Sequence, residues 1–424
     1  MTSTDNSLMR KYTELDTYGR QLMDFPMRNL GLTVCFFALL KPSLFDLNST
    51  VTLACRLASV AVFAWMLYRY VSSKTKLSTP LVLFVLFRVS FLLPTLANNG
   101  DVLNWGYTTL GQVALFALIE WETREGGDRA LDCFKILRTL LAAYLVANCL
   151  MIVFDFGSVQ RLQSDGEITT WYLLGIRTRV TDCFFPALMI SLIVDRLKGK
   201  QIGVLTLAIL FVGIVQISLL EVTTAFAGLA VFAVAFAATT LSQTMNVRLS
   251  VRAIIVIGLA ITILVVGFRI QEHFAEFLAT VFDKSATLTG RTELWDSAFG
   301  IIGSSPVFGY GINDSVGAFV PWRGMYWQVH NQWLQLLYDG GIVAASLFVM
   351  FICAAGRNLE KSRELDKVII PAKSTLLAFM VMMVSEIYTY NMGLFFLAPF
   401  TMAALPNFAI SHDSETAKSR TELA

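Results

Sequence analysis

The chain has 424 residues, of which 55% are apolar and 15% are charged, and its formal net charge is +2. Soluble domains contain about 45–50% apolar and about 25% charged residues, so the composition excludes an ordinary soluble globular protein. The apolar residues also come in blocks about 20 residues long, the length that crosses a bilayer. We therefore expect a protein embedded in membrane lipid, and we expect no nucleic-acid partner.

Twelve apolar segments follow one another along the chain, and each is predicted to be a transmembrane helix. They lie near 29–46, 51–70, 79–97, 103–121, 133–155, 180–197, 202–220, 222–241, 251–268, 333–353, 373–388 and 392–409. Lys41 and Pro42 interrupt the first of them. The predicted fold class is an all-α polytopic membrane protein of about twelve helices.

The distribution of Lys and Arg predicts the orientation of these helices. An even number of helices puts both termini on one side, and with the termini in the cytoplasm every inner segment is basic. The chain then divides into a cytoplasmic tail at 1–28, nine helices at 29–268, a large outer loop at 269–332, three helices at 333–409 and a cytoplasmic tail at 410–424.

The outer loop at 269–332 holds the most distinctive residues of the chain. Apolar residues at helical spacing after His273 predict an amphipathic helix lying on the outer membrane surface. Arg291 follows Gly290 at a predicted helix start, and Trp295 falls on the same face one turn later. An arginine in the first helical turn, beside unpaired backbone N–H groups, is suited to bind an anion.

Two further arginines lie on the predicted outer face, against the usual bias of basic residues towards the cytoplasm. Arg177 and Arg179 are two residues apart where the 156–180 loop re-enters the membrane, so in an extended chain they would face the same way. Such arginines either bind a substrate or anchor in lipid headgroups.

His330 lies where the outer loop meets the tenth helix, next to Asn331. Trp322, Tyr326 and Trp327 precede it and form an aromatic belt of the kind found at membrane interfaces. These aromatic side chains are either interfacial anchors or a surface on which sugar rings stack.

The acidic residues and the cysteines indicate the function less clearly than the arginines and His330 do. Asp155, Asp182 and Glu221 lie near the outer membrane edge and are either interfacial residues or acid/base carboxylates. No pair of His or acidic residues has metal-ligand spacing, and the six cysteines lack C-x-x-C spacing, so we expect no metal site and no disulfide.

One combination of motifs resembles a known family. The run from Ser285 to Trp295 reads SATLTGRTELW and is followed by Pro306, Gly309-Tyr310-Gly311, His330-Asn331 and a Leu-rich helix with Gly340-Gly341. This order and spacing resemble the signature of the O-antigen ligase and Wzy-type polysaccharide polymerase family, with the wording closest to its exopolysaccharide polymerase branch. The resemblance covers roughly 285–345.

The resemblance implies a GT-C-like membrane glycosyltransferase in the bacterial inner membrane, with its active site on the periplasmic face. The implied donor is an undecaprenyl-diphosphate-linked glycan, with no metal or other cofactor. By motif, the loop arginine of the family is Arg291 and its catalytic histidine is His330, while its arginine before the sixth helix is Arg177 or Arg179. The cation that the family tends to show after the seventh helix has no clear counterpart, because the chain there contains Glu221. The implied partners are a flippase and a chain-length regulator of the same export pathway.

The chemistry of such a transfer agrees with these residue types. The departing diphosphate is an anionic leaving group that needs cations, which Arg291 and one of Arg177 and Arg179 would supply. The acceptor hydroxyl must lose a proton, and His330 is the expected base or acceptor-orienting group. The candidate acceptor or sugar contacts are Trp322, Tyr326, Trp327 and Asn331.

Two alternatives remain open from the sequence. A ligase would transfer the same lipid-linked glycan to lipid A core or to protein, since only the acceptor differs. A flippase or transporter would instead line a pathway through the bundle with charged residues, for which the candidates are Arg56, Arg88, Glu221 and Glu386.

Overall fold

The computed structural model describes residues 29–124, 126–162, 168–242, 249–270, 291–312, 328–357, 366–388 and 393–406. Each of the twelve predicted apolar segments contains at least one helix. The first half of the chain forms α2 (Leu30–Leu39), α3 (Ser49–Ser72), α4 (Thr79–Val89), α5 (Leu92–Ala97), α6 (Val102–Thr123), α7 (Gly127–Phe154) and α8 (Val180–Leu197). The second half forms α9 (Val204–Leu219), α10 (Thr223–Ser242), α11 (Val251–Thr262), α13 (Arg291–Ser304), α14 (Gln332–Arg357), α15 (Asp366–Met382) and a last helix at Leu397–Pro406.

Six of the described helical segments are long and apolar enough to cross a membrane, as expected of a polytopic membrane protein. They are Ser49–Ser72, Thr79–Ala97, Val102–Thr123, Gly127–Phe154, Thr223–Leu241 and Gln332–Arg357. Four further apolar helices are shorter. The total of twelve spans stays a prediction.

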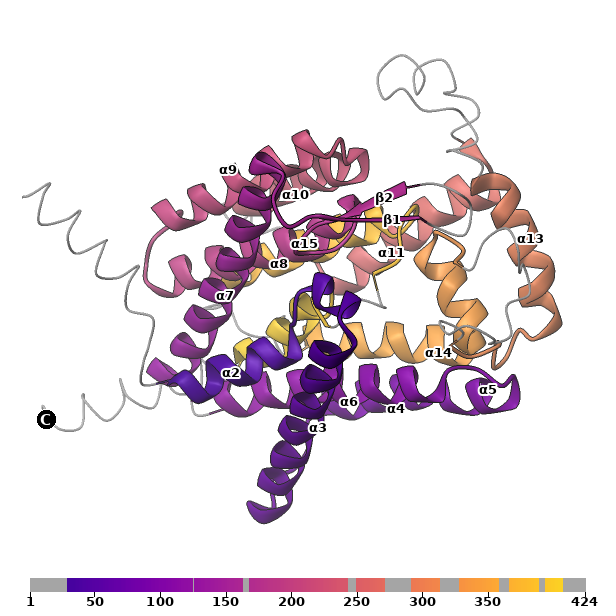
Figure 1. Cartoon of the computed structure of the whole chain (residues 1–424), viewed down its shortest axis with the longest axis horizontal. Helices are drawn as coiled ribbons and strands as arrows, with labels where there is room; N and C mark the ends of the chain where they lie inside the picture. The colour runs from indigo at the N-terminus through magenta and orange to yellow at the C-terminus, as the bar shows by residue number, and fades with distance from the viewer. Residues whose placement is uncertain are drawn as a thin grey trace, which may run out of the picture.

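α8 lies at the centre of one group of helices, where α7, α9 and α15 pack against it and α10 and α11 pack on α15 (Figure 1). Every residue from Val180 to Asp195 is buried, so this helix faces protein on all sides. Such a position tolerates charged residues like Asp182 and Asp195 that would be costly against lipid.

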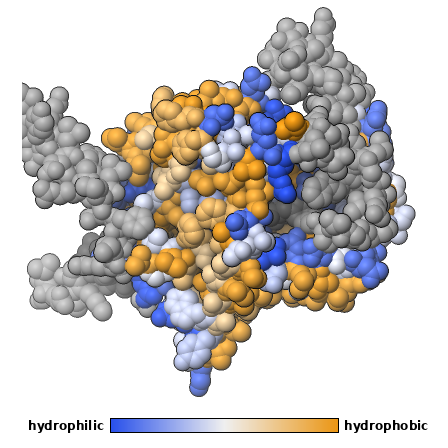
Figure 2. Space-filling model, in the orientation of Figure 1, coloured by the Kyte–Doolittle hydropathy of each residue, from blue (hydrophilic) through white to orange (hydrophobic). Residues whose placement is uncertain are grey.

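A second group of helices contains α3, α4, α6 and α14, and α3 projects from the rest of the molecule (Figure 1). Its core is aromatic: the rings of Phe116 and Phe400 stack with centroids 4.2 Å apart, and Phe84 packs against both. The visible face is largely apolar, and hydrophilic residues gather around the β1–β2 hairpin (Figure 2).

This hairpin is a departure from the all-α prediction. β1 (Val159–Leu162) pairs antiparallel with β2 (Ile168–Trp171) in the loop between α7 and α8. β-branched and aromatic residues such as Val159, Ile168 and Trp171 favour a strand. The polar composition of the loop hides this pattern, because the strands have only four residues each.

The Gly309-Tyr310-Gly311 motif pairs with a break in α14. Gly341 has φ 61°, which interrupts the helix and frees the carbonyl groups of the preceding turn. The N–H of Tyr310 donates to the Tyr338 oxygen at 2.7 Å, and the N–H of Gly311 donates to the Asp339 oxygen at 2.8 Å. The motif therefore attaches the chain that follows α13 to α14.

Candidate functional site

Four segments that are distant in the sequence meet at the start of α14: the turn before α8, the start of α13, residues 328–331 and the turn 383–388 after α15. Asn331 Nδ2 donates to the Val384 oxygen at 2.9 Å, and the Tyr388 N–H donates to Gln332 Oε1 at 2.7 Å. Arg179 Nη1 donates to the Ile387 oxygen at 3.1 Å, which joins the start of α8 to the same turn.

The tryptophan of the TGRTELW motif holds the histidine segment in place. Trp295 is buried, and its indole Nε1 donates to the Val329 oxygen at 3.2 Å. The Val329 N–H in turn donates to Gln335 Oε1 at 3.0 Å. α13 begins at Arg291, so this contact places Arg291 and His330 at one site, although 39 positions separate them in the sequence.

Each of the two site arginines has a carboxylate partner. Arg291 Nη2 lies 3.3 Å from Glu386 Oε1, and these side chains are 24% and 15% exposed. Arg179 Nη1 lies 3.6 Å from Asp182 Oδ2, and these side chains are 22% and 3% exposed. Both arginine side chains therefore remain partly exposed.

His330 lies within electrostatic range of both arginines. Its half-buried imidazole, together with the positive charges of Arg291 and Arg179, lowers the pKa of His330 from 6.5 to about 4. The imidazole is thus neutral at pH 7 and able to accept a proton. Its backbone has φ 52°, a left-handed conformation that is uncommon outside glycine and often marks functional sites.

The structure brings Lys41 close to Arg179, which the sequence did not indicate. Lys41 interrupts the first apolar segment as predicted, since α2 ends at Leu39, but its side chain is buried and paired with Asp46. Lys41, Arg179 and Asp182 line one cavity of about 80 Å³. The signal in the sequence is a lysine between two apolar stretches, which by itself indicates only a helix break.

The structure separates the two arginines that the sequence left equivalent. Arg177 is exposed, whereas Arg179 points to Asp182 and Ile387. The expectation of an extended chain was wrong, because residues 177–179 form a 3₁₀ turn. With three residues per turn, positions two apart face different directions.

Asn331 was a candidate sugar contact. Its side chain is 0% exposed, Nδ2 donates to Val384, and Oδ1 accepts from the Leu334 N–H at 3.0 Å. These bonds favour a role in capping α14 and holding the 383–388 turn.

The candidate carboxylates lie in different places. Asp155 is exposed at the end of α7, where its carboxylate accepts from Ser158, and Glu221 is exposed in the turn between α9 and α10. Asp182 lies at the site and pairs with Arg179.

The charged residues named for a transport pathway have separate partners. Arg88 donates to Thr108 and Thr109, and the guanidinium of Arg56 lies 4.7 Å from the centre of the Tyr107 ring. Glu386 instead belongs to the site beside Arg291.

Trp322, Tyr326, Trp327, Gly290 and the amphipathic segment after His273 lie outside the described residues. Within the described residues, no group of three or more His, Cys, Asp or Glu could hold a metal ion. All six cysteines are described and free.

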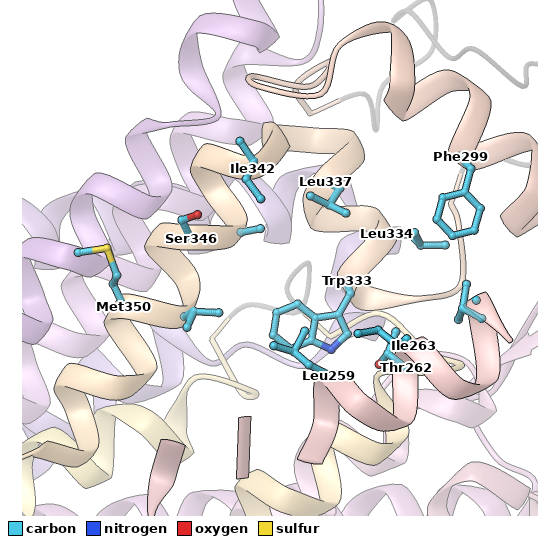
Figure 3. A pocket seen from close by; sticks show the side chains of 14 residues that line it. Leu259, Thr262, Ile263, Phe299, Trp333, Leu334, Leu337, Ile342, Ser346 and Met350 are labelled. Atoms are coloured by element: carbon cyan, nitrogen blue, oxygen red, sulfur yellow. The ribbon is translucent and has the colours of Figure 1, made fainter. Parts of the chain in front are cut away.

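An apolar cavity of about 650 Å³ lies beside the site, between α11, α13 and residues 333–350 of α14 (Figure 3). Trp333, three positions after His330, projects into it towards Leu259 and Ile263 (Figure 3). Ile263 belongs to a π-helical turn at Ile263–Gly267, a distortion that frequently marks functional sites. Phe299, Ile342 and Met350 on its wall are about half exposed.

A known protein-family model matches the part of the chain that contains Arg291 and His330. Residues 201–349 match the family model described as O-antigen ligase, and this region contains α13, Arg291, His330 and the break in α14. No curated protein and no solved structure matched the chain. Over residues 201–349 the chain is therefore similar to the O-antigen ligase family.

Proposed function

We propose that this protein is a membrane glycosyltransferase that polymerises undecaprenyl-diphosphate-linked repeat units on the periplasmic face of the bacterial inner membrane. It would have a GT-C-like architecture in which all twelve apolar segments cross the membrane. The observation that carries the proposal is the convergence of Arg179, Arg291 and His330 at the start of α14.

The charges suit the donor. Transfer breaks the bond between the anomeric carbon and the diphosphate oxygen, and the electron pair stays on the diphosphate. Arg179 and Arg291 are placed to bind that charge, and guanidinium groups bind phosphate oxygens through two parallel N–H donors. Losing one such contact costs on the order of 10²–10³ in rate.

The neutral His330 suits the acceptor. The attacking hydroxyl loses its proton as the new glycosidic bond forms, and a neutral imidazole can accept that proton. General-base catalysis of this kind contributes about 10²–10⁴ in rate. In this role the low pKa of His330, about 4, keeps the base unprotonated before substrate binds.

The apolar cavity suits the lipid. Its volume of about 650 Å³ is within the range of roughly 300–1,000 Å³ typical of ligand sites. Trp333 connects it with the start of α14, so a diphosphate held by Arg291 could extend its isoprenoid chain between α11 and α14.

The matching family is described as O-antigen ligase, and this favours a ligase as the second candidate function. Both functions use the same donor chemistry and differ in the acceptor. A polymerase extends a second lipid-linked glycan, whereas a ligase transfers to lipid A core or to protein.

The test uses purified protein, a synthetic undecaprenyl-diphosphate-linked repeat unit and a strong chelator. We expect longer glycan chains on the lipid without any added metal, and much slower turnover for Arg291→Lys because lysine lacks the planar fork. Product on added lipid A core alone would favour the ligase. Activity that vanishes with chelation and returns with a divalent ion would contradict the role of the arginines.

A further inference from the structure

We propose that Glu386 competes with the substrate's diphosphate for Arg291. Its carboxylate holds Arg291 while the site is empty, leaves when the donor diphosphate binds, and returns to help release the lipid diphosphate product. The inference rests on the proposed function and adds a residue that controls product release.

The contact between Glu386 and Arg291 is one that a ligand can replace. It is a single approach of 3.3 Å, and both side chains are partly exposed. A diphosphate would bring several charged oxygens, each able to form a shorter charge-assisted hydrogen bond. The donor can therefore displace the carboxylate by offering better partners.

The surroundings let the side chain move without moving the backbone. The turn 383–388 is held on both sides of Glu386: the Gln332 N–H donates to the Met383 oxygen at 2.9 Å, and the Tyr388 N–H donates to Gln332 Oε1. The backbone at both ends of this turn is therefore held in place, so the carboxylate can leave Arg291 by rotation about the side-chain bonds of Glu386.

Asp182 is less suited to the same role. It lies in the first turn of α8 with a side chain that is only 3% exposed, so it has little room to leave Arg179. We assign it to holding Arg179 in position. Glu386 is the carboxylate that exchanges.

The charge of the reaction product explains why a carboxylate that competes for Arg291 is useful. The product lipid diphosphate has lost its glycan and gained an ionisable oxygen, so its charge is at least as negative as that of the donor. Cations that stabilise the leaving group therefore bind the product at least as tightly as the substrate. Product release is rate-limiting in many enzymes, and a carboxylate on Arg291 would accelerate it.

A purely structural ion pair makes the opposite prediction. If Glu386 only neutralised Arg291 and kept it oriented, its removal would misplace the guanidinium and weaken diphosphate binding. The sign of the change in affinity therefore separates the two roles.

The experiment measures binding of farnesyl diphosphate, a short-chain analogue of the product, to purified full-length protein by calorimetry. Glu386→Gln should bind it about tenfold more tightly than the unaltered protein, because Arg291 is freed. Single-turnover glycan transfer should persist while multiple turnover slows. Added undecaprenyl diphosphate should inhibit this variant more strongly.

Glu293→Gln is the matched control, since Glu293 is exposed two positions from Arg291 on the same helix. This variant also removes one carboxylate charge near Arg291. Its affinity for farnesyl diphosphate should stay within about twofold of that of the unaltered protein. Should Glu386→Gln fail to fold, Glu386→Asp retracts the carboxylate by one methylene and should also bind more tightly.

The outcomes distinguish the inference from the proposed function. Equal or weaker binding by Glu386→Gln or Glu386→Asp, with binding intact in the unaltered protein, overturns the inference alone. An unaltered protein that neither binds farnesyl diphosphate nor transfers glycan overturns the proposed function as well. If Glu293→Gln raised the affinity for farnesyl diphosphate as much as Glu386→Gln, the effect would be one of general charge, and the inference would also be overturned.

Discussion

At the residue scale, the charge of His330 decides whether it can act as a base. Desolvation and the two nearby arginines lower its pKa to about 4, compared with 6.5 for an ordinary histidine. The unfolded chain therefore binds more protons than the folded protein between these values. The contribution of His330 to folding stability is complete above pH 6.5 and is lost as the pH falls towards 4.

We predict that the pH dependence of activity is shifted to low pH, as the pKa of His330 is. The kcat/KM value reports the free enzyme, so it should not fall at the ordinary histidine pKa and should decline only as the pH approaches 4. Bound diphosphate adds negative charge beside His330, so kcat should decline at a higher pH than kcat/KM. Initial rates across the pH range test this. A kcat/KM midpoint near 6.5 would show that burial and the two arginines do not lower the pKa of His330 in the free enzyme.

Arg177 and Arg179 supply a second prediction at the residue scale. Arg179→Ala should lower kcat/KM by on the order of 10²–10³, because it removes a diphosphate contact. Arg177→Ala should leave the rate within a few-fold, because Arg177 is exposed on another side of the 3₁₀ turn. Steady-state assays of both variants decide between substrate binding and headgroup anchoring. Equal losses would favour anchoring by both residues.

At the element scale, α13 and α14 form a frame around the site. Trp295 fixes one end of α13 to Val329, and the Gly309-Tyr310-Gly311 motif fixes the chain after α13 to the break in α14. The distance between Arg291 and His330 depends on both attachments. A substitution that disrupts the attachment of Gly309-Tyr310-Gly311 to α14 should therefore also disturb the site.

Gly309→Ala tests this frame. Gly309 has φ +69°, and a Cβ there would overlap the Tyr338 oxygen. The left-handed conformation alone costs about 1–2 kcal/mol for a residue with a Cβ. We expect a lower melting temperature and reduced transfer activity. Gly300→Ala in α13 is the control, because a Cβ there meets nothing within 4 Å. It should stabilise the protein slightly or leave it unchanged. Equal melting temperatures for the two variants would contradict the frame.

At the scale of the whole molecule, the proposed chemistry requires the site to face the periplasm. Ser304 lies at the end of α13 and Ser73 follows α3, and both are exposed. The positive-inside distribution puts Ser304 outside and Ser73 in the cytoplasm.

Cysteines introduced at these two positions, in a background without the native cysteines, test the topology. A membrane-impermeant thiol reagent should label the Ser304→Cys protein in intact spheroplasts and the Ser73→Cys protein only after lysis. The reverse pattern would put the site in the cytoplasm and rule out a periplasmic transfer reaction.

The sequence by itself determined the features that depend on local composition. Each of the twelve apolar blocks contains a helix, because burying a helix in lipid requires a continuous apolar stretch. The break at Lys41 was also predictable, because Lys41 and Pro42 interrupt the apolar stretch and α2 ends at Leu39. The order of the motifs predicted the family whose model matches residues 201–349.

Tertiary structure decided which residues form the site. The sequence could not choose Arg179 over Arg177, because the choice depends on a 3₁₀ turn that packing stabilises. It could not pair Arg291 with Glu386, which lies 95 positions away, or place buried Lys41 beside Arg179. These contacts arise from helices that pack through apolar faces, and packing of that kind leaves no local pattern around the charged residues it brings together.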